Sequence, residues 1–182
     1  DKNGVYQFVA NRFATTMFIS LPAEYQVPLD ANKKPAYYKT GIIRNAVNRK
    51  DFELTPNVEN EDNFTFIAIG DPQCENQTEI DRYKNETIED IKRTLSTNQL
   101  NGRFKNAYAV TLGDIVNDTP DLWENIKVTM ENVKLNDGSY LPFFQCIGNH
   151  DHNAKLSDET AAVGNFNTHF GPTDYSFNRG KV

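Results

Sequence analysis

The feature that most constrains the fold of this chain of 182 residues is an alternation of apolar runs and helical patterns after residue 63. The apolar runs are residues 64–70, 107–113 and 141–148, and segments long enough for a helix separate them. Strands that alternate with helices form a largely parallel sheet whose two faces are both covered. The sequence therefore predicts an α/β fold for this part of the chain.

Helical patterns lie between and after these runs. Apolar residues recur about once per helical turn in residues 78–98, and again in residues 119–134, where Thr119 is placed to cap the first turn. A weaker helical pattern follows in residues 157–170. The last segment, residues 174–182, is predicted to form a fourth strand.

The first third of the chain has a different pattern. Runs rich in β-branched and aromatic residues at 5–10 and 15–20 predict short strands, and loops that contain proline follow them. The polar stretch 55–63 has the composition of a linker. We therefore expect two parts, an incomplete all-β sandwich domain with its linker in residues 1–58 and an α/β domain in residues 59–182.

Composition excludes several classes of protein. The chain has 25 Asp and Glu against 19 Lys and Arg, and no run of basic residues is longer than a pair, so we expect no binding to a nucleic-acid backbone. No apolar run approaches the roughly 18 residues of a membrane-spanning helix. The two cysteines, Cys74 and Cys146, do not make a disulfide framework. The phosphate loop of nucleotide-binding proteins and the Gly-x-Ser-x-Gly turn of serine hydrolases are both absent from the sequence.

All three predicted strands end in glycine followed by a residue that can bind a metal ion, namely Asp71, Asp114 or Asn149. The carboxyl ends of neighbouring parallel strands meet at one edge of a sheet, so these side chains are expected to converge. Oxygen ligands with some histidine suit Mn²⁺, Fe, Zn²⁺ or Mg²⁺. Two such cations would clamp a phosphate group and supply the positive charge that an acidic protein lacks.

The order of these motifs resembles the calcineurin-like metallophosphoesterase superfamily. The residues that carry the resemblance are Asp71-Pro72-Gln73, Gly113-Asp114-Ile115-Val116-Asn117 and Gly148-Asn149-His150-Asp151. The resemblance covers about residues 64–182. It implies a β-sandwich of two sheets flanked by helices, a phosphate-ester small molecule as substrate, and hydrolysis of monoesters or diesters by water activated by two divalent metal ions.

The resemblance implies four metal ligands, which are Asp71, Gln73, Asp114 and Asn149. Asp114 is expected to bridge the two ions, and Asn149 is expected also to contact the phosphate. The family usually has histidine at the position of Gln73, although an Asp-Pro-Gln form exists as a variant. Because glutamine offers an oxygen where histidine offers a nitrogen, we expect weaker or altered binding of the first metal ion.

Further roles follow from the same resemblance. His150 is expected to act near the leaving-group oxygen as transition-state stabiliser or general acid, with Asp151 orienting it. Asn117 is expected to brace the loop that carries the bridging carboxylate. His152 is placed to line the pocket.

The family also uses a later histidine and a Gly-His-x-His element. The residues after Asn149 contain no Gly-His-x-His, and His152 and His169 have the wrong sequence context to replace these ligands. We therefore expect the chain to represent the first half of such a domain, with a partial metal site and little activity by itself. The N-terminal segment loosely resembles the small immunoglobulin-like or carboxypeptidase-regulatory-like domain that precedes the catalytic domain in some exported bacterial metallophosphoesterases. This likeness favours a periplasmic or extracellular location.

A non-catalytic binding or scaffold module that retains the same fold is the alternative. Gln73 would then be the first sign of a lost metal site. The presence of Asp114, Asn149 and His150 together favours the enzyme.

Overall fold

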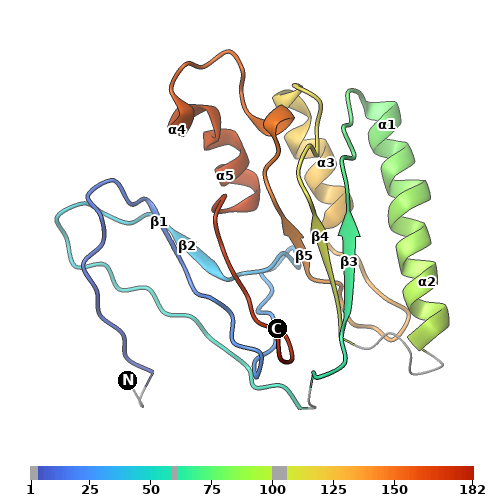
Figure 1. Cartoon of the computed structure of the whole chain (residues 1–182), viewed down its shortest axis with the longest axis horizontal. Helices are drawn as coiled ribbons and strands as arrows, with labels where there is room; N and C mark the ends of the chain where they lie inside the picture. Colours follow the sequence, from blue (N-terminus) through green and yellow to red (C-terminus); the bar gives the residue numbers. More distant parts are fainter. Residues whose placement is uncertain (1–3, 59–60, 100–105) are drawn as a thin grey trace.

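The computed structural model describes residues 4–58, 61–99 and 106–182. Its centre is a parallel sheet of three strands in the order β3-β4-β5, as Figure 1 shows. The strands are β3 (Thr65–Ile69), β4 (Ala107–Thr111) and β5 (Phe143–Gln145). The prediction of an α/β fold with neighbouring parallel strands is confirmed, because each predicted run contains one of these strands.

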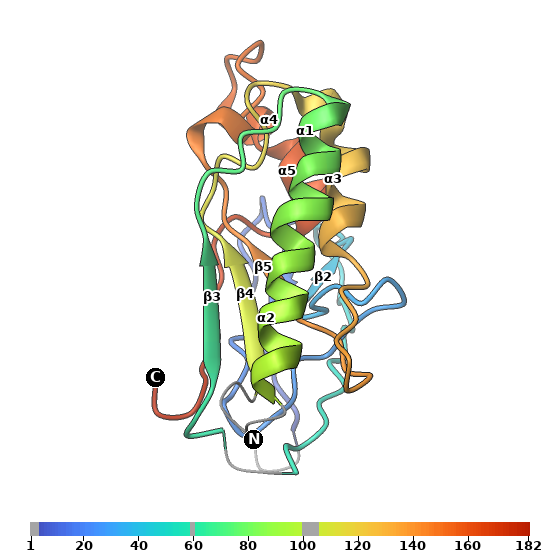
Figure 2. The same cartoon turned by 90° about the vertical axis from the view of Figure 1, so that its right-hand side faces the viewer.

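Helices cover one face of this sheet, as the edge-on view in Figure 2 shows. The first helical rod consists of α1 (Gln77–Arg82), the π-helical turn η1 (Tyr83–Ile88) and α2 (Glu89–Gln99). The other helical segments are η2 (Pro120–Leu122), α3 (Trp123–Met130), η3 (Asn149–Asp151), α4 (Glu159–Ala162) and α5 (Gly164–Phe170).

Within the described part of the chain, no helix has the length and apolar character needed to cross a membrane.

The helix predicted for residues 119–134 begins with the 3₁₀ turn η2 and ends at Met130, earlier than expected. Thr119 does not cap it, because its hydroxyl donates to the carbonyl oxygen of Cys74 at 3.0 Å instead. The chain leaves the helix after Met130, and Val133 accepts a hydrogen bond from the backbone of Leu141 at 2.9 Å. A tertiary backbone contact has therefore replaced the last helical turn.

The face of the sheet under the helices holds the larger core. Trp123 and Ile126 from α3 are fully buried there, and the Trp123 ring meets Phe166 and Phe170 of α5 edge-on at 6.1 and 5.2 Å. Every residue of β4 is buried. The central strand is thus covered on both sides, as a continuous apolar strand requires.

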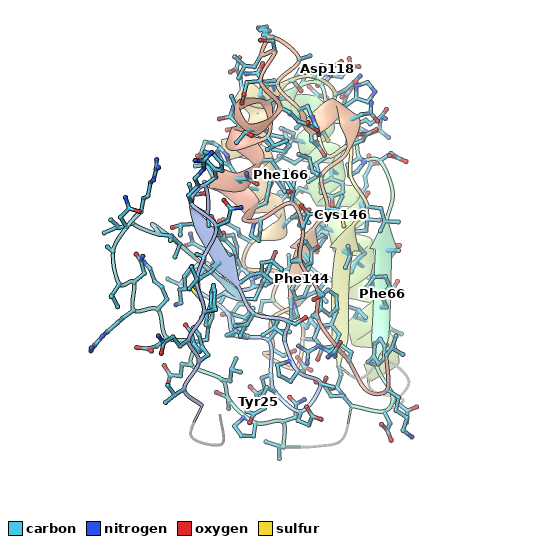
Figure 3. The ribbon with its side chains drawn as sticks, turned by 60° about the vertical axis from the view of Figure 1, so that its left-hand side comes forward. Tyr25, Phe66, Asp118, Phe144, Cys146 and Phe166 are labelled. Atoms are coloured by element: carbon cyan, nitrogen blue, oxygen red, sulfur yellow. The ribbon has the colours of Figure 1, made fainter. Side chains whose placement is uncertain are left out.

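The opposite face of the sheet is covered by the two ends of the chain. Phe144 of β5, which is labelled in Figure 3, is 1% exposed. Its ring stacks on Phe177 at 4.3 Å and contacts Tyr37 at 5.5 Å. Leu21, Tyr37 and Phe144 belong to one buried cluster, with Phe177 packed against it. The N-terminal segment therefore shares a core with the α/β sheet.

Two predicted strands are wrong. Residues 5–10 have no regular structure. Residues 174–182 do not join the sheet beside β5, because the segment lies across its face, where Phe177 makes a single bridge to Leu21. Stacking of aromatic rings on Phe144 holds this segment over the face and away from the strand edge.

The predicted run 15–20 is represented by β1 (Thr16–Phe18), which pairs antiparallel with β2 (Tyr38–Thr40). This pair is the only sheet in the described part of the N-terminal segment. This part of the chain therefore contains a small β element, and the expected immunoglobulin-like sandwich is not confirmed.

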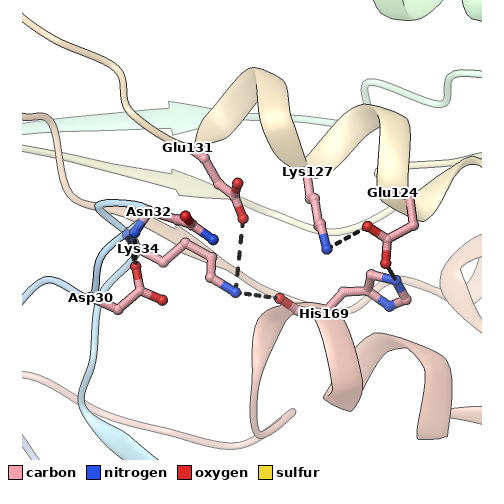
Figure 4. A network of polar contacts seen from close by, with 7 residues as sticks. All are labelled: Asp30, Asn32, Lys34, Glu124, Lys127, Glu131 and His169. Atoms are coloured by element: carbon pink, nitrogen blue, oxygen red, sulfur yellow. Dashed lines mark hydrogen bonds and ion pairs between the residues drawn. The ribbon is translucent and has the colours of Figure 1, made fainter.

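A polar network joins the N-terminal segment to α3 and α5 (Figure 4). Lys34 lies with its ammonium nitrogen 3.9 Å from Glu131 Oε1 and donates to the carbonyl oxygen of His169 at 3.2 Å. The ring of His169 lies 2.9 Å from Glu124 Oε1. His169, at the end of α5, therefore has a structural role.

We predict that Phe144→Ala destabilises the protein by about 3–5 kcal/mol, because it removes a buried ring that contacts both chain ends. Urea denaturation followed by the fluorescence of Trp123, which lies on the other face, measures this. Phe13→Ala is the control, because Phe13 is mostly exposed. Equal midpoints for the two variants would contradict the shared core.

Candidate functional site

The candidate site lies at the edge of the sheet where the parallel strands end, at the top of Figure 1. Asp71 follows β3, Asp114 follows β4 and Asn149 follows β5. Asp71 and Asp114 both have a left-handed backbone, with φ of 42° and 48°. Such angles are uncommon outside glycine and tend to cluster at functional sites, where the surrounding structure must hold them.

Asp114 is the centre of this edge. Its side chain is buried, and its Oδ1 accepts a hydrogen bond from the backbone N–H of His150 at 3.0 Å. Its Oδ2 accepts from the Gln73 side-chain amide at 3.3 Å, and its carbonyl oxygen accepts from the Gln73 backbone N–H at 2.8 Å. The structure therefore brings Gln73, Asp114 and His150 together from three separate strand ends.

Gly148 allows this approach. A Cβ atom on Gly148 would lie 2.1 Å from Asp114 Oδ1 and 2.2 Å from the Asp114 backbone nitrogen. Gly113, with φ of 104°, is equally crowded, because a Cβ there would lie 2.9 Å from the Cα of Gly148. The two glycines thus bring the loops after β4 and β5 into backbone contact.

Asp151 joins the same two loops through its carboxylate. Oδ1 accepts from the backbone N–H groups of Ile115 and Val116 at 2.8 and 3.1 Å, and Oδ2 accepts from Gly148 at 2.8 Å. The pKa of Asp151 is raised to about 6, chiefly by burial and in smaller part by nearby Asp114, against the lowering effect of these three donors. Asp151 is therefore a clamp between loops.

The residue that faces the His150 ring is Asp118, where Asp151 was expected. His150 Nδ1 lies 3.2 Å from Asp118 Oδ2, although the two atoms lack the alignment of a hydrogen bond. The Asp118 backbone N–H also donates to the carbonyl oxygen of His150 at 3.2 Å. Figure 3 shows Asp118 at the edge where the strands end. Asp118 was not among the residues predicted from the sequence, and its position four residues after Asp114 was the only signal for it.

The remaining predicted residues differ in their surroundings. Asn117 donates from its side chain to Glu75 and from its backbone to Cys74, so it ties the loop after β4 to the loop after β3. Asp71 and Asn149 are exposed, and His152 is half-buried. No hydrogen bond or ion pair joins the side chains of these last three residues to any other residue that the structure describes.

The donor set decides which metal ions this edge could hold. In the described ranges, no group of three or more His, Cys, Asp and Glu side chains is placed to bind a metal ion. The candidate ligands are instead two carboxylates and two amides, from Asp71, Asp114, Gln73 and Asn149. All four offer oxygen, which suits a hard divalent cation such as Mg²⁺ or Mn²⁺. Four oxygen ligands are enough for one such ion whose coordination is completed by water, and two ions would have to share them.

The site is an open edge. A cavity of about 20 Å³ lies elsewhere, where the N-terminal segment meets β5 and α5 beside Tyr38, Gln145 and Phe170. Asp71, Gln73 and Asn149 face solvent at the candidate site. A ligand there would therefore bind against the loops from outside.

Comparison with known proteins found no family model, no curated protein and no solved structure that matches this chain. Any function must therefore be argued from the site.

We predict that Asp151→Asn destabilises the protein by about 1–3 kcal/mol, because one oxygen becomes an NH₂ group that faces a buried N–H donor. Chemical denaturation at neutral pH measures this. Asp158→Asn is a matched control, since Asp158 accepts a single N–H bond from Ala161 at a helix N-terminus, where asparagine caps equally well. If the free energy of unfolding falls no more than in the control, Asp151 does not hold the two loops together.

Gly148→Ala should destabilise the protein by about 1–3 kcal/mol, because the new methyl group overlaps the backbone of Asp114. Gly164→Ala is the control, because a Cβ at Gly164 meets nothing within 4 Å and alanine favours the helix there. Denaturation midpoints of the two variants provide the comparison. If Gly148→Ala is as stable as Gly164→Ala, the loops are not in the contact described.

Proposed function

We propose that this chain provides part of the active site of a metallophosphoesterase, a hydrolase that cleaves phosphate monoesters or diesters. The observation that carries the proposal is the position of Asp114. Its buried carboxylate lies at the carboxyl edge of a parallel sheet, held by Gln73 from one side and by the backbone of His150 from the other. Asp71 and Asn149 are exposed at the ends of the two neighbouring strands.

Asp71, Gln73, Asp114 and Asn149 would hold divalent metal ions. Of Mn²⁺, Fe, Zn²⁺ and Mg²⁺, the oxygen ligands favour Mn²⁺ or Mg²⁺. When bound, such ions polarise a phosphate oxygen and lower the pKa of a coordinated water. Two hydrogen bonds to Asp114 fix the direction of its carboxylate, as the outer contacts of a metal ligand usually do. The cations would also offset the negative charge of this edge, which Asp118 and Glu75 increase.

His150 would serve the leaving group. Its backbone is held by Asp114 and Asp118, and Asp118 lies beside Nδ1. This leaves Nε2 as the nitrogen that could donate a proton to the leaving-group oxygen. Asp118 would act as a positioning residue, and Asp151 would keep the loops of His150 and Asp114 together.

The same proposal extends to the whole fold. The sheet β3-β4-β5 would be the first half of a two-sheet phosphoesterase sandwich, which would complete the metal site. The pair β1–β2 would belong to a small all-β domain of an exported protein, periplasmic or extracellular. The order of the three strand-end motifs in the sheet supports the first of these statements.

The test begins with metal binding. We predict that the chain binds Mn²⁺ and that Asp114→Asn weakens this binding at least about tenfold, because a ligand charge is lost. Asp137→Asn is the matched control, since Asp137 is an exposed carboxylate in the turn that precedes β5, at the opposite end of the sheet. Titration calorimetry measures both variants. Equal Mn²⁺ affinities would contradict the assignment of Asp114.

The second step is turnover of bis(p-nitrophenyl) phosphate and p-nitrophenyl phosphate by a longer protein that contains this chain. Hydrolysis that needs Mn²⁺ and is lost in Asp114→Asn would establish the enzyme, and the ratio of the two rates would separate diesters from monoesters.

One observation favours a non-catalytic module. The Gln73 amide already donates a hydrogen bond to one carboxylate oxygen of Asp114. Mn²⁺ binding without turnover would support that reading.

A further inference from the structure

Residues 4–15 and 41–50 form one surface, which we call the N-terminal surface. They leave the same end of the β1–β2 pair, where Thr16 and Thr40 are partners. The backbone N–H of Ile42 donates to Thr15 at 3.2 Å, and the hydroxyl of Tyr6 contacts the carbonyl oxygen of Lys50. In Figure 1 the two segments lie at the left, on the far side of the molecule from α1 and α2.

Large apolar side chains of both segments point into solvent. The exposed fractions are 99% for Val9, 91% for Val47, 71% for Phe13, 66% for Ile43 and 61% for Phe8. Single exposed apolar residues are ordinary, but a group of them on adjoining loops marks an interaction surface. These residues stand on irregular backbone, so they project separately and do not form a flat face.

The charge of this surface is opposite to that of the protein. The two segments contain Arg12, Arg44, Arg49 and Lys50 and no Asp or Glu, whereas the whole chain has a formal net charge of −6. The first acidic side chain, Asp51, follows at the border. The Arg12 guanidinium lies 4.5 Å from the centre of the Phe13 ring, so cationic and aromatic groups are interleaved.

We propose that the N-terminal surface binds an anionic lipid surface, with its apolar side chains inserted at the level of the headgroups. Arginine and lysine are attracted by anionic lipids, and exposed aromatic and aliphatic side chains enter the boundary between headgroups and acyl chains. A fluid layer accepts separate projecting side chains, whereas a protein partner would need a complementary shape. This proposal is independent of the phosphoesterase activity and requires no membrane-spanning helix.

Flotation of the chain with vesicles tests the proposal. We expect binding to vesicles of phosphatidylcholine with about 30% phosphatidylglycerol, and none to phosphatidylcholine alone. Raising the salt from about 0.1 M to about 0.5 M should release most of the protein, because screening shortens the reach of the charges. Val9→Ser with Val47→Ser, and separately Arg44→Ser with Arg49→Ser, should each lower the bound fraction at least about fivefold.

The control carries matched changes on the helical side, Val128→Ser with Lys92→Ser, at exposed or half-exposed positions of α3 and α2. It should bind as the unmodified chain does, and unchanged denaturation midpoints should show that all variants fold. The proposal fails if neutral vesicles bind equally well, if no vesicles bind, or if the variants and the control behave alike. Analytical ultracentrifugation that shows a dimer lost in the same variants would instead assign the surface to a second copy of the chain.

Discussion

The candidate site depends on the hydrogen bonds that the buried carboxylate of Asp151 accepts from the backbone of two loops. Its two oxygens accept three backbone N–H groups, two from the loop after β4 and one from Gly148 after β5. Hydrogen bonds to a charged carboxylate are stronger than those between neutral groups. Without the carboxylate, the buried N–H groups would be left without a hydrogen-bond acceptor, because water does not reach them. The loops that present Asp114 and Asn149 are therefore held by a residue whose own side chain never reaches the surface.

The candidate ligands at this edge differ in how firmly they are held. Asp114 is buried and hydrogen-bonded on both oxygens, whereas Asp71 and Asn149 stand free at the surface on the strands to either side. The close approach of Gly113 and Gly148 leaves no space for a side chain between the loops. A cation or phosphate would thus meet one fixed carboxylate flanked by groups that can still adjust, which is a suitable arrangement for a ligand that arrives from solvent.

The sheet is covered on both faces. Helices bury one face around Trp123, and the two ends of the chain bury the other around Phe144. Charge separates along the molecule as well, because carboxylates gather at the strand-end edge while the N-terminal surface carries only cations. The two proposed activities therefore use different parts of the protein, and either could be lost without the other.

The sequence by itself determined the three strands, the first helical rod and the strand-end positions of Asp71, Asp114 and Asn149. Apolar period and glycine placement are local signals, and parallel pairing then brings strand ends together. Only the tertiary structure decided that Asp118 faces His150, that Asp151 binds backbone groups, and that residues 5–10 and 174–182 are not strands. Those outcomes depend on packing between groups that lie far apart in the sequence. In addition, a side chain with high strand propensity can pack on the face of a sheet as well as in a strand, as Phe177 does on Phe144.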